Sequence, residues 1–273
     1  MVFLSYIPQP PLAAFVELFW YFEGYAEHYA KERVLPTGDV QFVISLHDDA
    51  LRSYDTHDTE RSQTYHGPLV CGPHSKHSII DTTLLATSMG VKFMPGGAFP
   101  FLGAPAGELH NLNVPLDALW GPAAHDLRDR LLEARTPIAR FRILEQTLLG
   151  QAHTKARERH PAVTFALKEF QAVPQERTIA EVTKHADLSP KWFIEVFRAQ
   201  VGLTPKLYCR LRRFQTALTR IGRPQQMDWT KVAMACGYFD QAHFIRDFRA
   251  FAGLSPTKYL ADRTEHQNHV RLD

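Results

Sequence analysis

Two segments in the C-terminal third carry polar and basic side chains at a spacing that suits contact with DNA. Each segment has two phenylalanines four residues apart, Phe193 and Phe197 in one and Phe244 and Phe248 in the other, which a helix turns toward a core. The opposite face of each helix is then free to enter the major groove, where its first residues reach base edges. We therefore expect DNA contacts from Ser189, Lys191, Trp192, Glu195 and Arg198 in the first segment, and from Asp240, Gln241, Ala242, His243, Arg246 and Arg249 in the second.

The two segments belong to an internal repeat. FIEVFRAQVGLTPKLY (193–208) aligns with FIRDFRAFAGLSPTKY (244–259) at an offset of 51, and nine of the sixteen positions are identical. Each copy is expected to form a helix, a short turn and a second helix, because Ser189 and Asp240 can cap the second helix and Pro190 suits its first position. The repeat predicts two helix-turn-helix units in tandem.

A basic segment joins the two units. Residues 203–221 contain no helix breaker after Pro205, so we expect one helix of about 17 residues, roughly 25 Å long. Recognition helices that read one face of a duplex lie about 34 Å apart. A rigid connecting helix, together with the ends of its neighbours, can supply that distance. The cations of this segment suit phosphate contacts, and they are Lys206, Arg210, Arg212, Arg213 and Arg220.

These motifs resemble the C-terminal domain of AraC-type transcription regulators. The resemblance covers residues 178–262 and lies in G-x-[ST]-P-x-x-Y in both copies, in R-x-x-R-F-x-x-A from Arg210 to Ala217, and in A-x-x-x-G-[YF]-x-D-x-x-x-F-x-R-x-F-[RK] from Ala233 to Arg249. It implies a bacterial protein that binds promoters sequence-specifically and activates or represses transcription. It also implies that the other domain senses a ligand or mediates dimerisation.

Three positions depart from the family pattern: Thr183 replaces the usual Ala, Asp187 the usual Gly, and Glu195 the usual Arg. Glu195 matters most, because Arg246 holds the same position in the second copy. A carboxylate there repels phosphate, although it can accept a hydrogen bond from cytosine N4. It could instead pair with a nearby arginine and stay off the DNA. We predict that the second unit supplies most of the affinity.

Residues 1–115 are expected to be rich in β-strands. Proline and glycine punctuate short apolar runs between 34 and 103, and Val40, Phe42 and Ile44 alternate with other residues as in a half-buried strand. Several such strands with intervening turns favour a barrel-like or cupin-like domain over an α/β sheet.

The whole chain is predicted to be α+β, with a β-rich domain, connecting helices and an all-α domain. The expected parts are a sensor domain at 1–150 (β-rich 1–115, helical 116–150), a linker at 151–161, the DNA-binding domain at 162–263 and a polar tail at 264–273. Within the first part, the polar segment 48–66 is predicted to be a loop.

The composition is that of a folded protein, with 45% hydrophobic and 22% charged residues. No apolar run approaches the ~18 residues of a membrane span, and the N-terminus lacks the features of a signal peptide. Three cysteines, widely spaced, do not suggest a disulfide framework, so we expect a cytoplasmic protein. Residues 160–262 hold 15 Lys/Arg against 9 Asp/Glu, whereas 1–159 hold 14 against 18, so the basic part is the one suited to a polyanion.

Other residues of the N-terminal part could carry chemistry. Cys71, His74 and His77 are metal-ligand types at close spacing, but a site would need a further ligand such as His66 or His110. Residues three apart in a strand also face opposite sides. We therefore expect ordinary histidines and no metal or other cofactor.

Two further features allow a structural and a functional interpretation. The aromatic residues Phe15, Phe19, Trp20, Phe22 and Tyr25 could line a pocket for an apolar effector or form the core of a β domain. The pair at 96–97 could cradle a phosphate, but without a following Lys-Ser/Thr we expect a tight turn. No local motif of a nucleophilic triad is present, and we expect no catalytic residues.

The leading hypothesis is a transcription regulator that responds to a ligand or partner and is not an enzyme. Its expected partners are double-stranded promoter DNA, RNA polymerase, a small effector and a second copy of the chain, with no membrane. Two alternatives stay open: an enzyme whose β domain is anchored to DNA, and an architectural protein without sequence preference. Metal content would favour the enzyme, and competition with random DNA would separate the sequence-blind binder.

Overall fold

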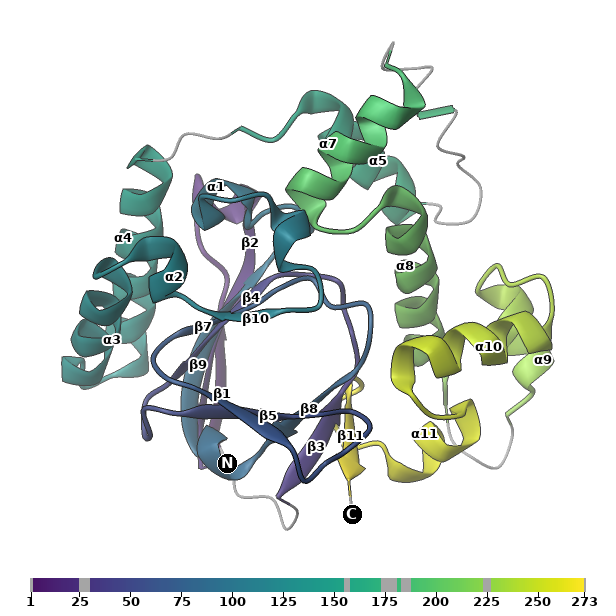
Figure 1. Cartoon of the computed structure of the whole chain (residues 1–273), viewed down its shortest axis with the longest axis horizontal. Coiled ribbons are helices and arrows are strands. Elements are labelled where there is room, and N and C mark those ends of the chain that lie inside the picture. Colours follow the sequence, from purple (N-terminus) through teal and green to yellow (C-terminus); the bar gives the residue numbers. More distant parts are fainter. Residues whose placement is uncertain are drawn as a thin grey trace.

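The computed structural model describes residues 2–24, 30–154, 158–172, 181–182, 188–222 and 227–272. It contains a two-sheet β domain, helices on one outer side of that domain, and a helical C-terminal domain on another side (Figure 1). The predicted α+β class and the order of its parts are confirmed. Thr183, Asp187 and Tyr25 lie outside the described residues.

The β domain is built from two antiparallel sheets. The larger has the order β1 (Val2–Tyr6), β2 (Val16–Glu23), β9 (Thr87–Phe93), β4 (Gln41–Ser45), β7 (Leu69–Cys71) and β10 (Asn113–Pro115). The smaller has the order β11 (His269–Leu272), β3 (Lys31–Val34), β8 (Ser78–Asp81), β5 (Leu51–Tyr54) and β6 (Ser62–Tyr65).

Two expectations change here. The predicted loop at 48–66 is wrong, because β5 and β6 form a hairpin within it. The segment 264–273, expected to be a polar tail, contains β11, which pairs with β3 of the N-terminal domain. The C-terminal segment is therefore part of the sheet that the N-terminal half begins.

Helices cover the outer face of the larger sheet (Figure 1). They are α1 (Phe99–Leu102), α2 (Asp117–Trp120), α3 (Ala123–Glu133) and α4 (Pro137–Thr154). Short 3₁₀ turns follow β1 (η1, Leu12–Ala14), β8 (η2, Thr83–Leu85) and α1 (η3, Ala106–Leu109). Because α4 continues to Thr154, it occupies the start of the predicted linker. None of the helices in the described part of the chain combines the length and apolar character that a membrane span requires.

Strand β2 explains why residues 18–22, between Glu17 and Glu23, are apolar without interruption. Phe19 and Tyr21 are buried in the core beneath the helices, whereas Leu18, Trp20 and Phe22 line a cavity on the other face. Side chains alternate between the faces of a strand, so a strand covered on both faces needs apolar residues at nearly every position. Phe19 of the aromatic run therefore belongs to the core and Trp20 and Phe22 line the cavity, whereas binding of an apolar effector there stays a prediction.

The C-terminal domain contains α5 (Pro161–Ala172), α7 (Pro190–Val201), α8 (Pro205–Arg220), α9 (Trp229–Ala235), α10 (Gln241–Ala252) and α11 (Pro256–Asp262). The predicted caps are confirmed, because the Ser189 side chain accepts from the backbone N–H of Trp192 at 3.3 Å and Asp240 Oδ1 accepts from that of His243 at 2.7 Å. The connecting segment is one helix, α8, of 16 residues. It is about 24 Å long.

The two domains share a closely packed contact at α8. Leu35, which follows β3, is buried in the same apolar cluster as the helices of the C-terminal domain. Beside it, Gly38 has a φ of +80°, and a Cβ there would lie 2.6 Å from Leu211 Cδ2 and 3.0 Å from Leu203 Cδ1. Gln215 Nε2 donates to the carbonyl oxygen of Pro36 at 2.7 Å. The loop at 35–39 therefore fits against α8 without space for an added side chain.

We expect Gly38→Ala to lower the free energy of unfolding by about 2–3 kcal/mol. An alanine at positive φ costs about 1–2 kcal/mol, and overpacking against Leu211 costs about 1 kcal/mol or more. Gly67→Ala is the matched control, because Gly67 has a φ of +74° and no heavy atom within 4 Å of an added Cβ. Urea unfolding of both variants checks this. Equal midpoints for the two would show that the contact with α8 is loose.

Candidate functional site

The faces predicted to meet DNA are exposed, and the faces predicted to be buried are buried. Phe193, Phe197, Phe244 and Phe248 have no exposed surface. The exposed residues on the opposite faces are Ser189, Lys191, Trp192, Glu195 and Arg198 near α7, and Asp240, Ala242, Arg246 and Arg249 near α10. Trp192 packs edge-to-face on the His160 ring at 5.0 Å, which fixes its indole beside the start of α7. The DNA contacts of these residues stay predictions.

Two predicted contact residues of α10 also have partners within the domain. Gln241 Oε1 accepts a hydrogen bond from the Thr230 hydroxyl at 3.0 Å, so it ties α10 to α9. His243 Nε2 lies 3.8 Å from Asp247 Oδ2, and its ring packs edge-to-face on Tyr238 at 5.2 Å. Both side chains are half-buried, so they would reach bases from a fixed orientation.

Arg210 is part of the domain's internal structure. Its Nη2 lies 2.7 Å from Oδ1 of Asp247, whose carboxylate is 3% exposed, and its guanidinium lies over the Phe251 ring at 5.4 Å. The hydrogen bond to Asp247 raises the pKa of Arg210 above its usual value. This ion pair joins α8 to α10, so the structure gives Arg210 a role that the sequence does not indicate.

The other predicted cations have different surroundings. Arg213 Nη1 donates to the carbonyl of Gly237 at 3.3 Å and lies over the Tyr238 ring at 5.3 Å, which fixes the turn of the second unit. Arg198 lies against the β domain, where a Cβ on Gly107 would be 3.0 Å from its Cγ. Lys206 is exposed in the first turn of α8. Of these three, Lys206 has the geometry best suited to a phosphate.

The β domain holds both recognition helices at their C-terminal ends. At the end of α7, a Cβ on Gly202 would lie 2.2 Å from Pro73 Cγ. At the end of α10, the backbone N–H of His77 donates to the carbonyl of Phe251 at 2.9 Å, and Arg33 Nη1 donates to that of Ala252 at 3.1 Å. The N-terminal ends, which would meet base edges, point away from these contacts (Figure 1).

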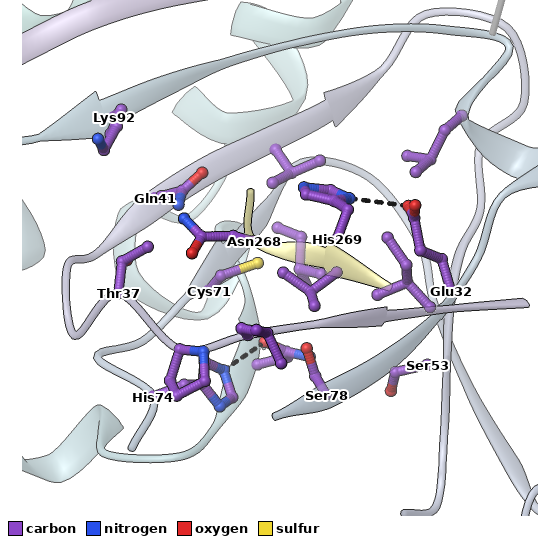
Figure 2. Close-up of a pocket in the computed structure, with 18 of the residues that line it drawn as sticks. Glu32, Thr37, Gln41, Ser53, Cys71, His74, Ser78, Lys92, Asn268 and His269 are labelled. Carbon is purple, nitrogen blue, oxygen red and sulfur yellow. Dashed lines mark hydrogen bonds and ion pairs between the residues drawn. The ribbon is translucent and has the colours of Figure 1, made fainter. Parts of the chain in front are cut away.

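A cavity of about 650 Å³ lies between the two sheets (Figure 2). Its apolar wall includes Leu18, Trp20, Val43 and Ile80. Polar residues interrupt this wall, and those labelled in Figure 2 are Glu32, Thr37, Gln41, Ser53, Cys71, His74, Ser78, Lys92, Asn268 and His269. An apolar cavity of this size with a few polar groups has the usual form of a small-molecule site.

The fold separates the side chains of Cys71, His74 and His77, which the sequence places at metal-ligand spacing. Burial raises the pKa of Cys71 to about 12, so its thiol stays protonated. His74 Nε2 lies 3.0 Å from Asn113 Oδ1, and burial lowers the pKa of this histidine. His77 instead packs against Gly253 of the helical domain, and burial lowers its pKa to about 4. Within the described ranges, no three His, Cys, Asp or Glu side chains lie close enough to hold a metal ion.

Comparison with known proteins supports the assignment of helix-turn-helix units to the C-terminal domain. Residues 182–262 match the family described as "Helix-turn-helix domain". A relative from Photobacterium leiognathi, "Probable transcriptional regulator LumQ", is 33% identical over 89 residues, which are 33% of this chain and 36% of the relative. "Arabinose operon regulatory protein" of Escherichia coli is 27% identical over 136 residues, 48% of this chain and 46% of the relative. Residues 182–262 form an AraC-type helix-turn-helix domain.

The rest of the chain has less informative relatives. Residues 4–115 match a family described as "Domain of unknown function (DUF6597)". A probable AraC family regulator from Rhodopseudomonas palustris is 24% identical, with a TM-score of 0.34 over 37% of this chain and 96% of that one. ToxT from Vibrio cholerae is 8% identical, with a TM-score of 0.45 over 96% of this chain and 98% of that one. The chain spans about a third to a half of the length of the curated relatives it matches.

Several residues around the AraC-type domain are missed by the motifs. Phe239 is 88% exposed and directly precedes the cap of α10, where an aromatic ring can reach a sugar or a thymine methyl. Met234, 67% exposed, lies at the end of α9. In the sequence, the signal that could have found Phe239 is an apolar residue in a predicted turn. The cavity residues at 265–269 have no such signal, because polar side chains dominate that segment.

We expect Arg210→Met to destabilise the AraC-type domain by about 2–4 kcal/mol, because Asp247 would be left buried without its main partner. Arg220→Met is the control, since Arg220 is exposed on the same helix and should cost less than about 0.5 kcal/mol. Chemical denaturation measures both changes. If the two variants unfold at the same denaturant concentration, Arg210 is free for a phosphate and the ion pair contributes nothing.

Asp39 gives the β domain a pH dependence. Burial raises the pKa of this carboxyl to about 6, and Lys92 and Arg212 only partly oppose the shift. The folded state therefore binds more protons than the unfolded state between about pH 4 and pH 6, and stability falls as the pH rises through that window.

Asp39→Asn should remove this loss of stability with rising pH. The change that it makes in the free energy of unfolding should be about 1–3 kcal/mol more favourable at pH 7.5 than at pH 4. Thermal unfolding across the pH range measures the difference. Asp129→Asn, at an exposed position of α3, serves as the control and should show no such pH dependence. A stabilisation that does not vary with pH would mean that Asp39 is not the titrating group.

Proposed function

We propose that the chain is an effector-responsive regulator of transcription that binds promoter DNA through its AraC-type domain and a small molecule in the cavity of its β domain. The observation that carries this proposal is that the β domain holds both recognition helices at their C-terminal ends. A change in the β domain would then alter the relative placement of the two reading helices. Sequence-specific binding by two helices requires a fixed relative placement.

The partners follow from this role. RNA polymerase and a second copy of the chain are proposed as protein partners, and the cytoplasm is the proposed location because a bacterial promoter lies there. The names of the relatives, a probable transcriptional regulator and an arabinose operon regulatory protein, support the assignment to transcription. The surplus of Lys and Arg in residues 160–262 supports contact with a polyanion.

Catalysis by the β domain has less support, and we propose that the chain is not an enzyme. Ser75 Oγ lies 2.9 Å from His110 Nε2, a distance that would suit a nucleophile and its base. However, neither residue is on the cavity wall, and Asn111 bonds the backbone and hydroxyl of Ser75. These hydrogen bonds join two loops of the β domain.

Selection of bound duplexes from a random library by the full chain tests the proposed function. We expect a shared sequence motif, and competition by unselected DNA at least 100-fold weaker than by the selected duplex at one fixed salt concentration. Enrichment without a motif, with equal competition by both duplexes, would identify a sequence-blind DNA binder. No retained DNA at all would remove the proposal.

We predict that Arg246→Ala weakens binding to the selected duplex about tenfold or more, whereas Glu195→Ala changes it by less than about threefold. The two residues hold the same position in the two repeats and are both exposed, so each variant is the matched control of the other. Mobility-shift titration at fixed salt gives both dissociation constants. An equal or reversed effect would show that the first unit contributes at least as much affinity as the second.

A further inference from the structure

The cavity between the two sheets has a wall from the C-terminal end of the chain. After α11 the chain returns to the β domain, and residues 265–269 line the cavity before and at the start of β11 (Figure 2). The neighbouring wall comes from the loop at 35–39, which precedes β4. A molecule in this cavity would therefore touch the loop between β3 and β4 and the segment that follows the last helix of the DNA-binding domain.

The returning segment is fastened on both sides. On the β domain, the N–H of Leu35 donates to the carbonyl of Asn268 at 2.8 Å, and His269 Nδ1 lies 2.8 Å from Glu32 Oε2. On the helical domain, the Tyr259 hydroxyl of α11 donates to the carbonyl of Gln267 at 2.8 Å. The segment is thus a bonded bridge between α11 and the cavity.

One side chain of α8 bonds both cavity walls. Gln215 Nε2 donates to the Pro36 carbonyl at 2.7 Å and to Asn268 Oδ1 at 3.1 Å. Pro36 and Asn268 both line the cavity, whereas Gln215 does not. Gln215 therefore bonds both cavity walls from α8, the helix that connects the two helix-turn-helix units.

The chemistry of the walls limits the ligand. The charged side chains of the wall are paired as Lys92–Glu17 at 2.7 Å, Arg52–Asp81 at 3.4 Å and His269–Glu32 at 2.8 Å. The free Oδ1 of Asp39 is closed off from solvent, and Lys76 and Glu265, which are exposed, carry opposite charges. Away from the exposed Lys76 and Glu265, a charged ligand would lose its hydration without gaining an accessible unpaired counter-ion. An uncharged ligand can bind while all three ion pairs stay intact.

We propose that the cavity binds an uncharged, mostly apolar molecule with one or two hydrogen-bonding groups, and that residues 265–269 together with Gln215 couple its binding to the DNA-reading helices. Trp20, Val43 and Ile80 contact the apolar part, and Gln41 and Ser78 supply hydrogen bonds at the wall. The ligand assignment rests on the cavity alone, whereas the coupling rests on the proposed function.

The coupling follows from linkage. A ligand shifts an equilibrium only by the difference in its affinity for the two arrangements. A ligand that touches residues 265–269 gains those contacts only while the segment is docked on β3, so it favours the docked arrangement. Docking places Asn268 within reach of Gln215 and so fixes α8 against the loop at 35–39. Gln215 is a positioning residue in this scheme.

Nile red, an uncharged fluorophore, tests the ligand class with the full chain. We expect one bound dye per chain and a dissociation constant at least tenfold lower than that of the anionic dye 1-anilinonaphthalene-8-sulfonate. Ser53→Trp fills the cavity and should weaken Nile red binding at least tenfold, whereas Ser62→Trp, exposed on the adjacent strand, should not. Absence of binding, tighter binding of the anion, or equal binding by the two variants would overturn the assignment.

Hydrogen exchange with and without Nile red tests the coupling. We expect the dye to slow exchange of amides at 264–272 and in the second half of α8 at least threefold. Gln215→Ala should keep the dissociation constant within threefold, keep the protection at 264–272 and lose the protection in α8. Thr216→Ala is the control, because its hydroxyl bonds only the carbonyl of Arg212 in its own helix.

Two outcomes would overturn the coupling: dye binding that leaves exchange at 264–272 unchanged, or protection of α8 that persists in Gln215→Ala. All these measurements are made without DNA. A failure of the duplex selection would therefore remove the proposed function while leaving the cavity result in place. Loss of dye binding would remove the ligand assignment while leaving DNA recognition untouched.

Discussion

The rest of the structure depends on how closely the loop at 35–39 packs on α8. Leu35 leaves its own sheet and joins the apolar cluster of the helical domain, and full burial of such a side chain contributes about 1.5–3 kcal/mol. Gly38 allows the loop to approach α8, since any side chain there would collide with Leu211. Because α8 also connects the two helix-turn-helix units, this one contact fixes the β domain, the cavity wall and the DNA-reading helices relative to one another.

The two units are similar in sequence but are held differently. The second is tied internally by the Arg210–Asp247 ion pair and by Arg213 on the Gly237 carbonyl, so α8, α10 and the turn behave as one body. In the first, Arg198 of α7 lies against η3 of the β domain. Because the β domain also bonds the end of α10, a change in the β domain would reach both units. At equivalent positions of the repeat, the second unit has Arg246 and the first has Glu195.

Local sequence patterns predicted the helical domain because its helix caps and buried faces depend on residues only a few positions apart. Ser189 and Asp240 cap helices through bonds to residues three positions away, and the phenylalanine spacing marks each buried face. The β domain was harder to predict. In the polar segment at 48–66, β5 pairs with β6 at the edge of the smaller sheet, and most side chains of the two strands are half-buried or exposed, so the apolar alternation is weak. Arg210 looks like a phosphate ligand in the sequence, because its partner Asp247 lies 37 positions away. The cavity and its wall at 265–269 depend on long-range pairing that no local pattern records.

Strand β11 has a consequence for how the molecule is made. Glu32 and His269, which face each other across the β3–β11 edge, are 237 positions apart in the chain. Synthesis proceeds from the N-terminus, so the nascent β domain must wait with an open edge at β3 until the ribosome has passed the whole DNA-binding domain. Such distant pairing slows folding and leaves an unpaired strand exposed meanwhile. The order of events follows directly: the helices of the AraC-type domain are synthesised before the strand that completes the smaller sheet and the segment that forms one wall of the cavity.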